Sequence, residues 1–169
     1  VKYDPEPEQK KNIFTKLLTG TDEENITHIA FINRKTPETS SWTYAHELGR
    51  LYLKDAFHGS VQTKAYDNIS GTDNAIAAIE QAIADGNEMI FTTSPEFLSA
   101  SLRAAVDHPE VKILNCSLNA SHKYIRTYYG RMYEAKFLIG VLAGVMTDTD
   151  KIGYIADYPI YGMTANINA

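Results

Sequence analysis

The chain has 169 residues, of which 44% are hydrophobic and 22% charged, with a formal net charge of -5. This size and composition suit one compact domain with a hydrophobic core, and no stretch reaches the roughly 20 apolar residues that a membrane helix needs. Basic residues are scattered and form no stripe, which disfavours nucleic-acid binding through this domain.

Residues 1–24 are polar and charged, and we expect a linker or docking arm there, ahead of an α/β lobe over residues 25–169. The chain starts at Val1 without a visible signal peptide or lipid-attachment cysteine, and 164–169 resemble the opening of a helix. We therefore expect a fragment of a longer protein.

Strand and helix signals alternate from Ile26 onward. Ile26–Ile32 is a β-branched apolar run typical of a buried strand. A helix is predicted over Ser41–Lys54, with Ser41 as its N-cap, followed by a strand over Ser60–Tyr66. Four residues of that helix are expected to share one face: Ala45, Leu48, Gly49 and Tyr52.

The next helix is capped by Thr72 or Asp73, carries isoleucines at helical spacing and ends before Gly86. Met89–Thr92 is predicted as a strand, and Ser94 caps the helix that follows. That helix is expected to turn Leu98, Leu102 and Ala105 inward.

Two further strands are predicted over Val111–Cys116 and Tyr124–Tyr128, then a long buried helix over Arg131–Thr147 and a last strand over Lys151–Ala156. This alternation indicates a doubly wound, mostly parallel sheet, a Rossmann-like α/β fold. Ligands of such sheets bind beyond the carboxyl ends of the strands. Four loops are therefore candidates: 33–41, 92–97, 115–122 and 157–162.

The first two loops carry the aromatic and hydroxyl groups that suit a flat, polar heterocycle. Trp42 could stack on such a ring, with Ser41 and Tyr44 beside it, or it could equally be a core residue. In the second loop the candidates could bind a ligand or, in the commoner alternative, only cap a helix. They are Thr92, Thr93, Ser94 and Phe97.

Catalysis is not expected. Cys116 with His46 or His122 could be imagined as a nucleophile and base, but a buried small thiol is the better interpretation. Neither nucleotide-phosphate nor metal-ligand spacing appears, so no cofactor and no metal are predicted. Arg131 and Glu134, three residues apart, suit an ion pair on the helix surface.

Three segments resemble the basic-membrane-protein (Bmp, PnrA-like) family of solute-binding proteins. The first is Ser41–Arg50, which reads Ser-Trp-Thr-Tyr-Ala-His-Glu-Leu-Gly-Arg, and the second is Tyr129–Lys136. The third is Lys151–Ile160, together with Gly162 and Ile167–Ala169. The resemblance covers residues 26–169. It implies the first lobe of a type I periplasmic-binding-protein fold, with a second lobe missing here.

Members of that family bind purine bases or nucleosides and deliver them to an ABC permease, and the resemblance favours the adenine-binding subgroup. It implies that Trp42 stacks on the base, with polar contacts from 92–97 and from the neighbourhood of Glu134. Tyr129 and Asn168 complete the candidate site. A cell-surface lipoprotein is expected; the alternatives are a cytoplasmic ligand sensor fused to another domain and, third, a nucleoside-processing enzyme. A lone lobe could also form a homodimer.

Overall fold

The computed structural model describes residues 26–117 and 123–155. Five parallel strands form one sheet in the order β2-β1-β3-β4-β5. The strands are β1 (Thr27–Ile32), β2 (Val61–Tyr66), β3 (Met89–Thr92), β4 (Lys112–Cys116) and β5 (Ile125–Tyr128). The helices are α2 (Ser41–Ala56), α3 (Thr72–Ala84), the 3-10 turn η1 (Pro95–Phe97), α4 (Leu98–Asp107) and α5 (Met132–Met146). The predicted doubly wound α/β fold is confirmed.

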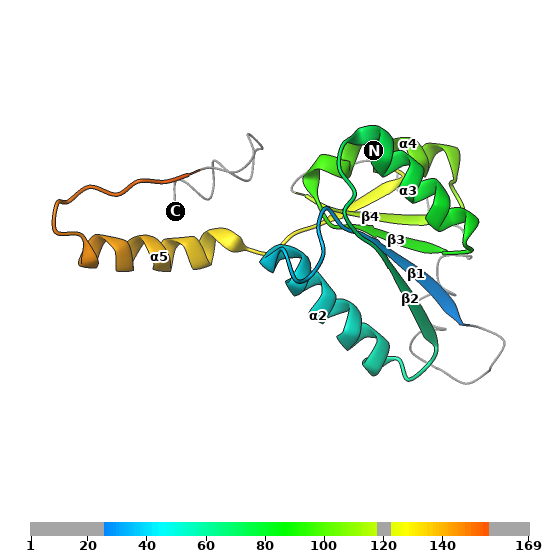
Figure 1. The fold of residues 1–169 in the computed structure, drawn as a ribbon, viewed down its shortest axis with the longest axis horizontal. Coiled ribbons are helices and arrows are strands. Elements are labelled where there is room, and N and C mark those ends of the chain that lie inside the picture. The colour runs from blue at the N-terminus through cyan, green and yellow to red at the C-terminus, as the bar shows by residue number, and fades with distance from the viewer. Residues whose placement is uncertain (1–25, 118–122, 156–169) are drawn as a thin grey trace, which may run out of the picture.

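Helices lie on both faces of the sheet, with α3 and α4 on one face and α2 on the other (Figure 1). Because both faces of the central strands are covered, those strands are apolar along most of their length, as parallel sheets require. The four residues Ile29–Ile32 are all buried.

The larger core lies between the sheet and the α3–α4 layer. Ile32, Ile90 and Ile113 come from three strands and pack against Ile79 of α3 and Phe97 of η1. The isoleucine spacing of α3 and the inward face of α4 were predicted correctly, since Ile76, Ile83, Leu98, Leu102 and Ala105 all belong to this core or pack on it.

The smaller core lies beneath α2, where Leu53 and Phe57 pack against Ile29, Phe31 and Val61. Ala45, Leu48, Gly49 and Tyr52, which were predicted to share one face of this helix, are all exposed. Three polar residues of the helix are less exposed, namely Thr43, Glu47 and Arg50. Arg50 bonds both Glu47 oxygens (2.6 and 2.7 Å) and donates to the Thr63 hydroxyl over 2.6 Å. An ion pair therefore contacts β2 from this helix.

The helix starts differ slightly from the prediction. Ser40, not Ser41, caps α2, and its hydroxyl accepts from the backbone nitrogen of Thr43 over 3.3 Å. Gly71 precedes α3 with a φ of 78°, so Thr72 is the first helical residue and not a cap. Ser94 caps the following helical segment as predicted, and its hydroxyl accepts from the Glu96 nitrogen over 3.3 Å.

The segment after β5 departs most from the prediction. The helix α5 forms, but none of its residues is buried, and it extends away from the sheet (Figure 1). Residues 151–155 are exposed and form no strand, so the predicted strand Lys151–Ala156 is not found in its described part. The predicted burial of α5 is not found within the described residues, because none of its side chains is buried there. The predicted arm 1–24, loop 157–162 and helix opening 164–169 lie outside the described residues.

Candidate ligand site

The candidate site lies at the carboxyl edge of the sheet, where β1 and β3 are neighbours. The chain leaves β1 toward β2 on one side and later returns to β3 on the other. This reversal in strand order marks the position where α/β sheets with the order 2-1-3-4-5 bind ligands. The turn after β1, the start of α2 and the turn after β3 meet at this position.

Trp42 joins two of these segments. Its indole nitrogen donates to the carbonyl oxygen of Thr93 over 2.7 Å. The side chain is 38% exposed, which is too much for a core residue. The bond fixes the indole over the β1–β3 boundary and uses its only polar hydrogen, so the ring offers a ligand its aromatic surface.

Two buried hydrogen bonds of its hydroxyl hold Thr93 in place. Its hydroxyl lies 2.9 Å from Oδ1 of Asn33 and 3.0 Å from the carbonyl oxygen of Ile32. The amide nitrogen of Asn33 donates to Asp67, just after β2, over 2.8 Å. A continuous chain of bonds therefore runs from Asp67 through Asn33 and Thr93 to Trp42, and connects the ends of β1, β2 and β3.

Glu96 makes a second connection between the same three turns. One carboxylate oxygen pairs with Arg34 Nε over 2.7 Å, and the other accepts from the backbone nitrogen of Gly71 over 3.1 Å. These contacts connect the three turns of the carboxyl edge to one another.

Aromatic side chains continue the site toward β5. The Trp42 ring lies 5.2 Å from the His46 ring and 6.2 Å from the Tyr129 ring, centroid to centroid. The rings of His46 and Tyr128 are 6.1 Å apart. Burial lowers the pKa of His46 below its ordinary value, opposed by the hydrogen bond of Nδ1 to the Trp42 carbonyl oxygen at 3.0 Å. A neutral imidazole therefore stands beside the indole.

The predicted site residues divide into two groups. Trp42, Thr93, Ser94 and Tyr129 come together at the carboxyl edge. Thr92 and Phe97 are fully buried: Thr92 lies 2.8 Å from the Ser101 hydroxyl, and Phe97 belongs to the larger core. Both support the edge from within.

The remaining predicted residues are not gathered there. Ser41 and Tyr44 are exposed on the first turn of α2. Glu134 lies on α5, where it pairs with Arg131 over 3.3 Å as predicted. Asn168 lies outside the described residues.

Sequence reasoning missed Asn33, Asp67 and Asn115 as supports of the edge. Each stands at or just after the carboxyl end of a strand, and that position was the only signal that could have singled them out. Cys116 is buried as predicted, and burial raises the pKa of its thiol to about 11, against a nucleophilic role.

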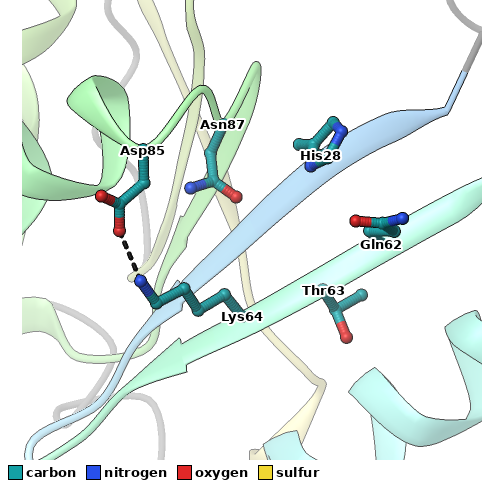
Figure 2. A pocket seen from close by; sticks show the side chains of 6 residues that line it. All are labelled: His28, Gln62, Thr63, Lys64, Asp85 and Asn87. Carbon is teal, nitrogen blue, oxygen red and sulfur yellow. Dashed lines mark hydrogen bonds and ion pairs between the residues drawn. The ribbon is translucent and has the colours of Figure 1, made fainter.

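A separate hollow of about 440 Å³ lies toward the opposite, amino end of the strands (Figure 2). It is lined by His28, Gln62, Thr63, Lys64, Asp85 and Asn87. The lysine that lines this hollow, Lys64, forms an ion pair with Asp85, and Asp85 also accepts a hydrogen bond from the Tyr66 hydroxyl. This hollow lacks the aromatic surface and the strand ends of the carboxyl edge, and we do not place the ligand there.

Residues 26–117 and 123–155 contain neither a membrane-spanning helix nor a metal-binding cluster. No described helix has the length and apolar content to cross a membrane. The same residues hold no cluster of side chains that could bind a metal ion.

Comparison with protein-family models matches residues 26–169 to the family described as Bmp, ABC transporter substrate-binding protein PnrA-like. The chain belongs to the Bmp family. Bmp proteins are ABC transporter substrate-binding proteins. The resemblance to the Bmp family that was read from the three sequence segments is confirmed.

Two curated relatives carry more specific names. A purine-binding protein of Brucella abortus is 28% identical over 141 residues, which cover 83% of this chain and 40% of the relative. A putative ABC transporter glucose-binding protein of Haloferax volcanii is 25% identical over 128 residues, covering 76% of this chain and 32% of the relative. This Bmp chain thus spans well under half the length of both.

Solved structures agree on the fold. A solute-binding protein of an ABC transporter system from Conexibacter woesei gives a TM-score of 0.60 at 15% identity, over 70% of this chain and 40% of the other. One from Burkholderia multivorans gives 0.53 at 12% identity, over 72% and 46%. At these identities, the similarity to the two solved structures establishes only the α/β architecture of this Bmp chain.

Proposed function

We propose that this chain is one lobe of a solute-binding protein that recognises a purine base or nucleoside at the carboxyl edge of β1 and β3. The observation that carries the proposal is the fixed, partly exposed indole of Trp42, held by the Thr93 carbonyl at 2.7 Å. An aromatic surface beside polar strand ends suits a flat nitrogen heterocycle, which can stack and hydrogen-bond there.

The name of the Brucella relative supports a purine ligand, because that protein is described as purine-binding and matches more of this chain than the glucose-binding relative does. A sugar would also pack on an indole, but the neutral imidazole of His46 and the ring of Tyr129 enlarge the aromatic surface. That surface suits a bicyclic base better than a hexose.

A second lobe is part of this proposal. The chain matches 40% of the length of the purine-binding relative, and a single sheet edge encloses only one side of a ligand, whereas pockets normally bury most of theirs. The apolar side chains of α5, among them Phe137, Leu142 and Val145, are at least half exposed. A helix that is apolar all round is ordinarily buried, which supports a neighbouring part of the protein that covers it.

In this account the intact protein works outside the plasma membrane and hands its ligand to an ABC permease, as expected of a substrate-binding family. The ligand binds and leaves unchanged. Stacking and hydrogen bonding need no nucleophile, and the buried Cys116 thiol offers none.

Isothermal titration calorimetry of the intact protein tests the proposal. Adenine, adenosine, inosine and guanosine are titrated in turn, with glucose as the comparison. We expect saturable binding of at least one purine at micromolar or tighter affinity, and no change of the ligand on chromatography afterwards. Binding of glucose with no heat from any purine would reject the proposal, and conversion of a nucleoside would point to an enzyme.

A further inference from the structure

Among the described residues, three buried polar atoms have no hydrogen-bond partner: Asn115 Oδ1 and Ser117 Oγ at the carboxyl end of β4, and the Tyr128 hydroxyl on the neighbouring strand. Asn115 is fully buried and Ser117 is 4% exposed. They are two positions apart, and the backbone nitrogen of Ser117 donates to the Asn115 carbonyl oxygen over 3.0 Å. Two neighbouring side chains at one strand end therefore each carry a buried oxygen without a hydrogen-bond partner among the described residues.

The orientation of Asn115 is fixed by its amide nitrogen. That nitrogen donates to the Thr92 hydroxyl over 2.8 Å and to the Ser94 carbonyl oxygen over 2.9 Å. An amide nitrogen has two hydrogens to donate, so both are used. Oδ1 is left as a pure acceptor facing no donor, and exchanging oxygen and nitrogen would set an oxygen against the Ser94 carbonyl.

An unpartnered buried acceptor costs a protein free energy, because its bond to water is lost on folding and is not replaced. Native structures keep such atoms rarely, and those they keep call for an explanation. Here the explanation is local, because Asn115 bonds directly to Ser94, the neighbour of Thr93. The Asn115 side chain thus connects the end of β4 to the turn that holds the indole of Trp42, and Ser117 follows two positions later.

We propose that Asn115 Oδ1 and Ser117 Oγ form a second polar anchor of the ligand site, which hydrogen-bonds a neighbouring donor and acceptor on the ligand. The proposal rests on the function proposed above. Asn115 accepts from an N–H or O–H of the ligand, and Ser117 donates to or accepts from the adjacent atom. Both the amidine-like edge of a purine and a pair of ribose hydroxyls offer this combination.

The Ser117→Ala variant tests the anchor through two readouts with opposite signs. Removal of an unpartnered buried hydroxyl leaves the melting temperature of the ligand-free intact protein unchanged or raises it. The same change weakens ligand binding about 3- to 10-fold, the range of one lost hydrogen bond. A purely structural serine would lower the melting temperature.

Two matched serines in α4 serve as controls. Ser101 is fully buried and satisfied, lying 2.8 Å from the Phe97 carbonyl oxygen and 2.8 Å from the Thr92 hydroxyl. Ser101→Ala should therefore lower the melting temperature. Ser99 is exposed, and Ser99→Ala should change neither melting temperature nor affinity.

Calorimetry with adenine and adenosine identifies the ligand group. A loss of affinity for both ligands assigns the anchor to the base edge, and a loss for adenosine alone assigns it to the ribose. Unchanged affinity for both, as expected if a water or another part of the chain satisfies the two atoms, overturns the anchor while leaving purine binding intact. If wild-type protein binds no purine, the function itself has failed.

Discussion

The indole nitrogen of Trp42 and the carbonyl oxygen of Thr93 lie 2.7 Å apart, although 51 positions separate the two residues in the chain. The bond crosses the boundary between β1 and β3, the place where the order of the sheet reverses. It turns an aromatic residue at the start of a helix into a fixed element of the carboxyl edge. The ligand site that we propose depends on this placement.

Replacement of Trp42 by alanine should weaken purine binding by about 1–3 kcal/mol, the usual contribution of a base stacked on an aromatic side chain. Trp42→Phe should lose less, because it keeps an aromatic ring and gives up only the bond to Thr93. Calorimetry on the intact protein measures both. An exposed residue of the same helix, Tyr52, provides the control variant Tyr52→Ala, and equal affinity in all three variants would show that the ligand does not stack on the indole.

Thr93→Val should destabilise the fold by about 1–3 kcal/mol, because it removes the hydroxyl that reaches Asn33 Oδ1 and leaves that buried oxygen unpartnered. Urea denaturation of the variant measures the loss. Thr36→Val changes a surface hydroxyl that lies 3.2 Å from the Thr39 hydroxyl and hydrogen-bonds the exposed Glu38 carboxylate, and surface changes of this kind stay within about 0.5 kcal/mol. If the two variants lose equal stability, the buried chain of bonds does not hold the edge.

The neutral state of His46 predicts a dependence of stability on pH. Burial lowers its folded pKa, so below about pH 6.5 the unfolded chain takes up the proton first and stability falls as the solution becomes more acidic. NMR titration of the ring should give a midpoint below 6.5. In His46→Gln this part of the stability loss between pH 7.5 and 5.5 should disappear, whereas a ring that titrates above 6.5 would contradict the assigned burial.

Asp85 should titrate near 2, because Lys64 first, then Tyr66 and Gln81, hydrogen-bond its charged form and lower its pKa. A lowered folded pKa contributes stability above the unfolded value of 3.8, and this contribution is lost as the pH falls from there toward 2. Lys64→Gln should move the midpoint upward, toward 3.8, in an NMR titration. A midpoint near 3.8 in the wild-type protein would show that the pair with Lys64 does not persist in solution.

The five strands of the sheet and their alternation with helices could be predicted, because burial on both faces produces apolar runs such as Ile29–Ile32. The face of α2 could not, since Arg50 packs its ion pair toward Thr63 and the apolar residues Leu48 and Tyr52 point outward. Propensity and periodicity do not reveal that a charged pair will take the inward position.

The candidate site was predictable only to the level of loops. The rule that ligands bind beyond the carboxyl ends of parallel strands located Trp42 and Thr93, but not the bond between them. The burial of Phe97 and the missing partners of Asn115 and Ser117 depend on packing across the sheet, and no local pattern encodes such contacts.

A structure of the intact protein with a bound purine tests the central claim most directly. The account predicts that the base lies parallel to the Trp42 indole, about 3.5–4 Å away, with the bond from the indole nitrogen to Thr93 still in place. A purine bound elsewhere, with the indole free of it, would contradict the account.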